Sequence, residues 1–147
     1  MAELTVETML ETVAQKFQVA PKDIASEKGA QSVYEARCAF VYLAHRLVHA
    51  ARMKEARKEN PEGIRRAGFA AMRHFTNRIY DELRELFNVD YADIRQLDDE
   101  AISLRKENEE FHNKTEAIWE EIDDAYELGS GQSGVIWIDR ATASKLS

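Results

Sequence analysis

Apolar side chains recur every three or four residues along most of the stretch from residue 4 to residue 128. This spacing places them on one face of an α-helix, and only two prolines, Pro21 and Pro61, occur in the 147 residues. The pattern therefore predicts a mainly α-helical fold. Hydrophobic residues make up 44% of the chain, which is enough for one modest core.

The first 90 residues divide into several helices separated by turn residues. Ser32 and Glu35 have the spacing of a capping box at the start of a long apolar helix. The segment Asn60-Pro61-Glu62-Gly63 is the clearest break in the chain. We predict helices at 4–17, at 21–24, from 32 to beyond 49, and at 64–88.

Residues 91–128 carry a seven-residue repeat with charged flanks. Such a repeat is typical of a long helix that packs on partner helices, as in a coiled coil. The alternative is a helix that folds back on its own domain. We predict that homo-oligomerisation uses Leu97, Leu104, Phe111, Ile118 and Ile122.

The end of the chain differs in composition from the rest. A Gly/Ser-rich linker begins at Gly129, and the segment Val135–Asp139 is β-branched and aromatic, which predicts a short strand. A lone strand must pair with another edge, so this segment could contact another subunit or a large motor or replication protein. The predicted organisation is a helix-turn-helix domain at 1–90, an acidic helical oligomerisation arm at 91–128, and a linker with a strand and tail at 129–147.

The charged residues are distributed unevenly. The net charge is −7, yet residues 45–80 contain nine basic and three acidic side chains, whereas residues 81–128 contain five basic and seventeen acidic ones. A basic block next to an acidic block often separates a surface that faces a polyanion from one that does not. The alternative is two solvated helices that carry opposite charges.

One stretch, residues 10–47, resembles a known family. Its helix contains Val13-Ala14 and Phe17, Asp23-Ile24 and Ser26 follow, and a second helix carries Val33, Arg37, Tyr42-Leu43-Ala44 and Leu47. In this register the stretch resembles the C-terminal DNA-binding domain of the replication initiator DnaA. The resemblance implies a helix-turn-helix whose recognition helix lies around residues 68–79. Gly68-Phe69-Ala70-Ala71-Met72 stands where that family has its Asp-His-Ser/Thr-Thr-Val signature.

The resemblance and the basic block together imply that this protein binds double-stranded DNA. Arginine, histidine and asparagine supply the hydrogen-bond donors that base edges and phosphates require. Lysine and arginine near the turn would contact phosphates and make the affinity depend on salt. The predicted DNA-binding residues are Arg37, Arg46, Arg52, Lys54, Arg57, Lys58, Arg65, Arg66, Arg73, His74, Asn77 and Arg78.

The sequence does not favour an enzyme. The single cysteine, Cys38, lies in an apolar helical stretch and is predicted to be a small core residue. His45 and His49 have a metal-chelating spacing but no third ligand, and the many carboxylates of 98–124 indicate a solvated surface. No glycine-rich phosphate loop is present, so we expect neither ATPase activity nor a cofactor.

No run of about 18 apolar residues occurs, and the start of the chain lacks the order of a signal peptide. We therefore expect a protein without membrane contact, in the cytoplasm of a bacterial or phage-infected cell.

Two alternatives to a DNA-binding regulator or replication accessory factor remain. The order of helix-turn-helix, central helices and short C-terminal strand is similar to that of phage small terminase subunits, which assemble rings and recognise viral DNA for packaging. The other alternative is an acidic protein–protein adaptor or DNA mimic that acts through residues 98–124. The mass in solution separates the first alternative from the regulator, and charge reversal of 98–124 tests the second.

Overall fold

The computed structural model describes residues 3–26 and 30–129, which form helices and turns with no strand among them. The predicted all-helical character of this part is confirmed, whereas the predicted strand Val135–Asp139 lies outside the described residues. The elements are α1 (Val6–Phe17), α2 (Pro21–Ile24), α3 (Gln31–Leu43), η1 (Ala44–Val48), α4 (His49–Glu59), α5 (Pro61–Ala67), α6 (Phe69–Phe87), α7 (Tyr91–Glu107) and α8 (Glu109–Tyr126).

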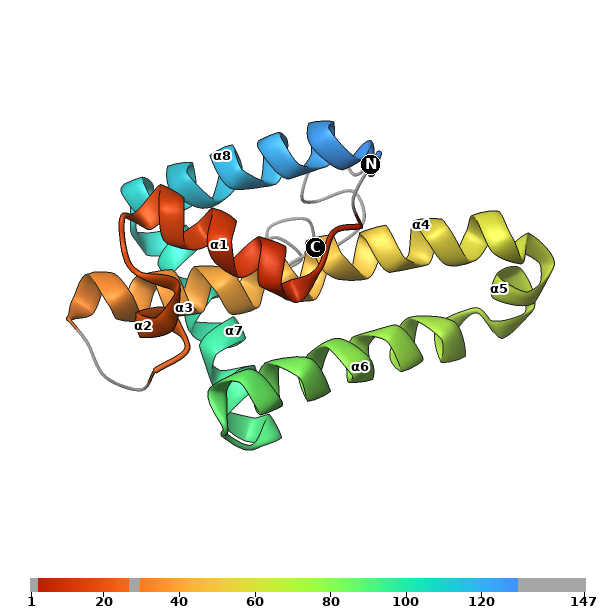
Figure 1. Ribbon diagram of the computed structural model, residues 1–147, viewed down its shortest axis with the longest axis horizontal. Helices are drawn as coiled ribbons and strands as arrows, with labels where there is room; N and C mark the ends of the chain where they lie inside the picture. The colour runs from red at the N-terminus through yellow and green to blue at the C-terminus, as the bar shows by residue number, and fades with distance from the viewer. Residues whose placement is uncertain (1–2, 27–29, 130–147) are drawn as a thin grey trace.

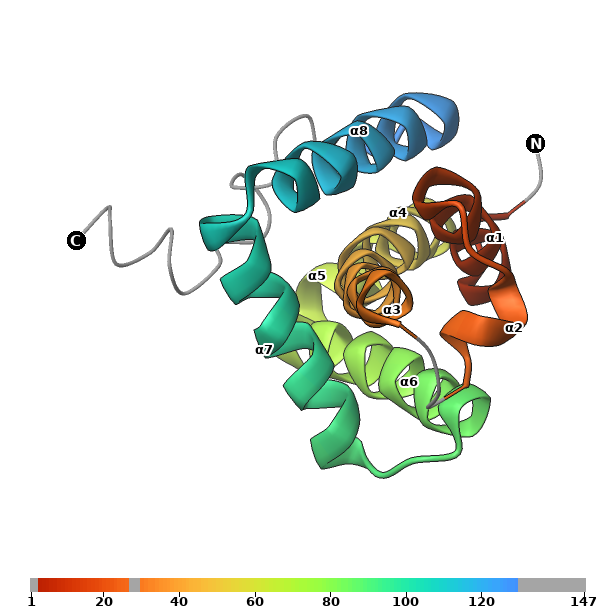
Figure 2. The ribbon, with the colours of Figure 1, turned by 90° about the vertical axis from the view of Figure 1, so that its left-hand side faces the viewer.

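A continuous central helix, formed by α3, η1 and α4, organises the fold. Figure 2 shows α3 enclosed by α1, α2, α6, α7 and α8. Every residue from 36 to 43 is buried. A helix buried on all sides has to be apolar on all sides, which explains why the sequence of this stretch contains so few charges.

The start of the central helix differs from the prediction. The N-cap of α3 is Ala30, without a side-chain hydrogen bond, so Ser32 and Glu35 lie inside the helix and do not form the predicted capping box. The side chain of Glu35 instead accepts a hydrogen bond from Gln31, one turn earlier, at 3.4 Å.

Between Ala44 and Val48 the central helix adopts π geometry. A π turn inserts an extra residue and rotates the side chains that follow it. His45 and Arg46 contact Asp98 of α7, whereas His49 contacts α6. The π turn therefore lies where the central helix changes from a fully enclosed rod to one side of a hairpin.

The predicted long arm at 91–128 is two helices. Asn108 ends α7 in an extended conformation, and its side-chain oxygen accepts a hydrogen bond from the Phe111 backbone N–H at 3.0 Å, which caps α8. Helix α7 packs mainly on α3, and α8 packs on α7 and α1. Residues of 91–128 thus share one hydrophobic core with residues of 1–90.

The predicted oligomerisation residues belong to this core. Phe111, Ile118 and Ile122 are buried in it, and Leu97 and Leu104 pack against it half-buried. The seven-residue repeat therefore reflects packing within the chain, which was the alternative interpretation. The prediction that Phe111, Ile118 and Ile122 face another subunit is wrong, whereas for the half-buried Leu97 and Leu104 it stays a prediction.

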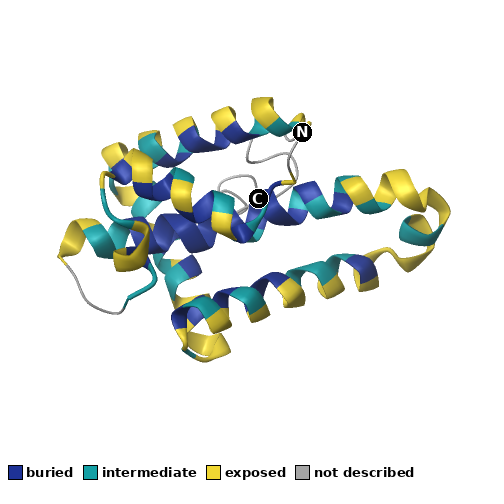
Figure 3. Ribbon diagram, viewed as in Figure 1, coloured by how far each residue is buried: buried dark blue, intermediate teal, exposed yellow. Residues whose placement is uncertain are grey.

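Helices α4, α5 and α6 form a hairpin that projects from this body. Figure 1 shows α4 and α6 side by side, with α5 at the far end. Figure 3 shows that exposed residues dominate the α5 end, whereas buried residues line the facing sides nearer the body. Helix α8 lies on the opposite side of the central helix from α6, so its acidic residues do not cover α6 (Figure 1, Figure 2).

Candidate nucleic-acid interface

The tip of the hairpin is defined by the predicted break at residues 60–63. The Asn60 side chain caps α5 by accepting a hydrogen bond from the Gly63 N–H at 3.0 Å, and Pro61 occupies the first turn. A Cβ atom at Gly63 would lie 2.2 Å from the Asn60 amide nitrogen, so a larger residue there would displace the side chain that caps α5. Gly68, with φ at 52°, separates α5 from α6 and divides the single helix predicted at 64–88.

Two contacts between α4 and α6 fix the width of the hairpin. Arg52 donates two hydrogen bonds to the Glu82 carboxylate, at 2.6 and 2.9 Å. The buried His49 ring lies 3.3 Å from the Met72 carbonyl oxygen and edge-on to Phe75. Arg52, a predicted DNA contact, is therefore already engaged in holding α6 against α4.

One face of α6 packs on the body and the other presents polar side chains. Ala71, Ile79 and Leu83 are buried on the inner face. The outer face carries four exposed polar residues, namely Arg73, His74, Asn77 and Arg78. Among the described residues no carboxylate pairs with either arginine, since the ion pairs of α6 involve Glu82 and Asp81.

Further cations surround the tip of the hairpin. Arg57, Lys58, Arg65 and Arg66 are all exposed. Arg65 pairs with Glu62 at 2.7 Å, and Lys58 lies 3.8 Å from Glu55, in each case one turn away on the same exposed helix. Such exposed pairs contribute little free energy, so both cations can exchange their partners for phosphates.

Besides Arg52, three further residues predicted to bind DNA are not available at this surface. Arg37 is buried and donates to the backbone carbonyl oxygens of Ile24, Asp23 and Ser26, where it closes the end of α2. Arg46 is buried in an ion pair. Lys54 donates to two carbonyl oxygens in the last turn of α8 and its C-cap, at 3.1 and 2.6 Å. Arg37 and Arg46 are therefore structural residues, and the prediction that they bind DNA is wrong.

The sequence pattern did not predict the ion pair of Arg46. Arg46 donates to the Asp98 carboxylate at 2.7 Å, and His45 lies 3.3 Å from its other oxygen. Burial disfavours the charged Asp98, yet the contacts with His45 and Arg46 outweigh it and lower the pKa of this carboxyl group. Asp98 follows Ile94 and precedes Ala101 on the buried face of α7, and that spacing was the available signal.

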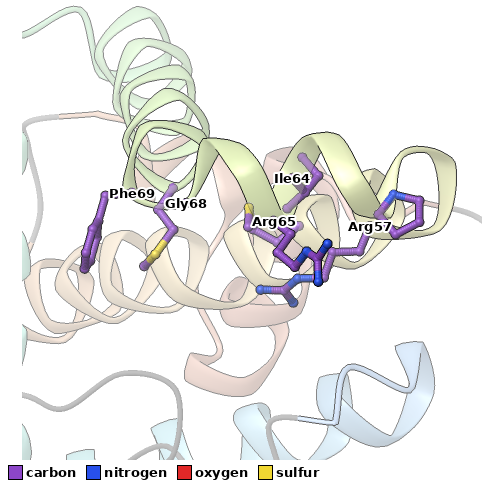
Figure 4. Close-up of a pocket in the computed structure, with 8 residues that line it drawn as sticks. Arg57, Ile64, Arg65, Gly68 and Phe69 are labelled. Carbon is purple, nitrogen blue, oxygen red and sulfur yellow. The ribbon is translucent and has the colours of Figure 1, made fainter.

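An apolar groove opens at the hairpin tip between α4, α5 and α6. Met53, Ile64 and Met72 contribute to its lining, and Figure 4 shows the Arg57 and Arg65 side chains toward one end and Phe69 at the other. The sequence pattern places Phe69 on the apolar face of the helix predicted at 64–88. In the structure the Phe69 side chain is 82% exposed, so that part of the prediction is wrong.

Three further features of the described part of the chain bear on function: its metal-ligating side chains, its cysteine thiol and the apolar character of its helices. No group of three or more His, Cys, Asp or Glu side chains there could hold a metal ion. Cys38 is buried, as predicted, and burial raises the pKa of its thiol to about 12, which keeps it protonated at neutral pH. None of the helices in residues 3–26 and 30–129 has the length and apolar character needed to cross a membrane.

Comparison with known proteins adds no assignment: no family model matches this chain, and neither the curated proteins nor the solved structures gave a significant match.

The hairpin should lose stability in acid because of His49. Burial, which is the largest cause, lowers its pKa from 6.5 to about 4. Between these values the unfolded chain binds a proton that the folded chain does not, so the free energy of unfolding falls as the pH drops. We expect His49 to account for a loss of about 3 kcal/mol between pH 7 and pH 4, at about 1.4 kcal/mol per pKa unit.

Urea denaturation at a series of pH values, followed by circular dichroism, measures this effect. His49→Gln keeps a donor for the Met72 carbonyl but has no titratable ring, so its stability should depend less on pH by that amount. An identical pH dependence in both proteins would show that His49 is not the group responsible.

Proposed function

We propose that this protein binds duplex DNA by placing α6 in the major groove, with the cations of the hairpin tip on the phosphate backbone. The observation that carries the proposal is the outer face of α6. There Arg73, His74, Asn77 and Arg78 are exposed, and no described carboxylate neutralises the arginines. Several other basic residues that were predicted to bind DNA instead make contacts within the protein.

The dimensions and the chemistry of α6 suit this role. A helix with its side chains is about 10–12 Å across, and the major groove is about 12 Å wide. Arg73 and Arg78 are five residues apart, which is about 7.5 Å along the helix axis or about two base-pair steps. Arginine can bind guanine and asparagine can bind adenine through two hydrogen bonds each, so this face could read bases as well as contact phosphates.

The order of elements supports the proposal, because a helix-turn-helix also places a short helix and a turn before the helix that binds DNA. The short helix α5 precedes the turn at Gly68, and α6 follows as the second helix, which in such motifs enters the groove. The first turn of α6 contains no acidic residue. The positive end of its helix dipole is therefore free to favour a nearby phosphate.

Titration of a fluorescent random-sequence duplex of about 25 base pairs, at salt concentrations from 50 to 200 mM, tests the proposal. If four or more of the exposed cations contact phosphates, the affinity should fall by about a hundredfold over this range. A salt series on the matching single strand and on a neutral dextran serves as control. Undetectable binding to the duplex at 50 mM salt would overturn the proposal.

The small terminase alternative has less support, because the side chains predicted to join its subunits pack inside one chain. If the mass in solution corresponds to a ring of subunits, this alternative regains support, with the subunits joined by other residues. The acidic adaptor stays an alternative for the exposed carboxylates of α8, and binding to a basic partner without any DNA binding would favour it.

A further inference from the structure

Phe69 is an exposed aromatic side chain that the fold does not use. Among the described residues, Phe69 and Tyr91 are the large hydrophobic side chains that are exposed, with 82% and 43% of their surface accessible. Tyr91 stacks on Tyr80 at 4.8 Å between ring centroids, whereas Phe69 stacks on no ring in the described part of the chain. Phe69 therefore offers apolar surface whose burial by a ligand would be favourable.

The position of Phe69 connects it to the outer face of α6. Phe69 is the first residue of α6, and Arg73 and Asn77 follow it at intervals of four residues. Residues at this spacing form one row along a helix, and Phe69 therefore continues the row of exposed polar residues toward the N-terminal end. Arg65 and Arg66, both exposed, precede it on α5.

The residues around Phe69 indicate what kind of ligand would cover it. They favour a polyanion that carries an apolar group rather than an apolar protein surface. Arg57 and Arg65 line the groove that ends at Phe69, and Lys58 and Arg66 are exposed nearby at the hairpin tip. Duplex DNA presents such a group in its major groove: thymine carries a 5-methyl group there, and phenylalanine is one of the side chains that contact it.

We propose that Phe69 contacts the 5-methyl group of a thymine in the major groove and so makes the protein prefer thymine at one position of its site. The inference rests on the proposed function of α6. Phe69 precedes Arg73 by four residues, or about 6 Å along the axis, so this thymine lies about two base pairs from the base or phosphate that Arg73 contacts.

The test replaces the methyl group by hydrogen. Duplexes that bind the full chain are first selected from a random-sequence library, and the best is resynthesised with deoxyuridine in place of every thymine, which keeps the base pairing. The wild-type protein should bind the deoxyuridine duplex roughly fourfold more weakly, the value for one buried methyl-sized group. Phe69→Ala should bind both duplexes equally, and Phe69→Leu should retain part of the preference.

Tyr91→Ala is the matched control, because it removes the other exposed aromatic side chain outside the proposed interface and should keep the thymine preference. If the wild type binds both duplexes equally, or Phe69→Ala retains the preference, this inference is overturned while salt-dependent binding still supports the proposed function. If no duplex is selected, the proposed function itself fails. If Phe69→Ala changes the sedimentation mass of the free protein, Phe69 belongs to a contact between copies and the inference is again overturned.

Discussion

Replacing Arg73 and Arg78 together by alanine should weaken duplex binding about a hundredfold at moderate salt. Both guanidinium groups are exposed on the outer face of α6 without a carboxylate partner among the described residues, so no ion pair within the fold competes with DNA for them. A phosphate or base contact by arginine contributes about 1–3 kcal/mol, and the removal of two corresponds to about this change in affinity. The slope of affinity against salt should fall as well, by about one for each phosphate that the variant no longer binds.

The matched control removes two charges elsewhere. Lys22 of α2 and Lys106 of α7 are exposed, and the double variant Lys22→Ala/Lys106→Ala changes the net charge by the same amount. Fluorescence anisotropy should give nearly wild-type affinity for this control. If both double variants bound DNA equally weakly, overall charge rather than the surface of α6 would determine binding. Both pairs lie on the surface, so the free energy of unfolding should change by about 0.5 kcal/mol or less per site.

Much of the hairpin could be predicted from the sequence because its turns depend on local chemistry. Asn60-Pro61-Glu62-Gly63 specifies a helix end and the cap of the next helix whatever surrounds it. Apart from Phe69, the helical stripe of α6 also follows from apolar spacing. Its exposed residues Arg73, His74, Asn77 and Arg78 therefore lie outward as the sequence analysis expected.

The break at Asn108 could have been found but was hidden by a misleading regularity. Leu104 and Phe111 lie seven residues apart on either side of it, because both helices turn an apolar face to the same core. Asparagine followed by Glu109 and Glu110 is typical of a helix N-terminus, where the side chain caps the helix and acidic residues favour its dipole. Local capping, rather than the repeat, determines the structure here.

The roles of the buried arginines could not be predicted from local pattern. Arg37 and Arg46 meet partners that are far away in the chain, namely the end of α2 and Asp98 of α7. For Arg46, which lies within it, the π turn at Ala44–Val48 also changes the direction of the side chain relative to an ideal helix, so simple spacing assigns this residue to the wrong face. Only the tertiary arrangement separates these structural cations from those left for a ligand.

Asp98→Ala should destabilise the protein by about 3–5 kcal/mol, because it leaves the buried Arg46 without its carboxylate. Chemical denaturation at neutral pH measures the loss. Asp99→Ala is the matched control: its carboxyl group is exposed on the next position of α7, and removing it should change the stability by about 0.5 kcal/mol or less.

The double variant Arg46→Met/Asp98→Leu separates a pairing effect from a packing effect. Because it removes both charges and keeps apolar volume, it should be less destabilised than Asp98→Ala, even though it alters one residue more. The lowered pKa of Asp98 gives a second readout. Its stabilising contribution is present above the ordinary carboxyl value of 3.8 and is lost as the pH falls through the lower pKa of the folded state, so wild type and Asp98→Ala should converge in strong acid. The single variants Arg46→Met and Asp98→Leu complete the comparison. If the double variant lost as much stability as the two single variants together, Arg46 and Asp98 would contribute independently, and the predicted pairing effect would be contradicted.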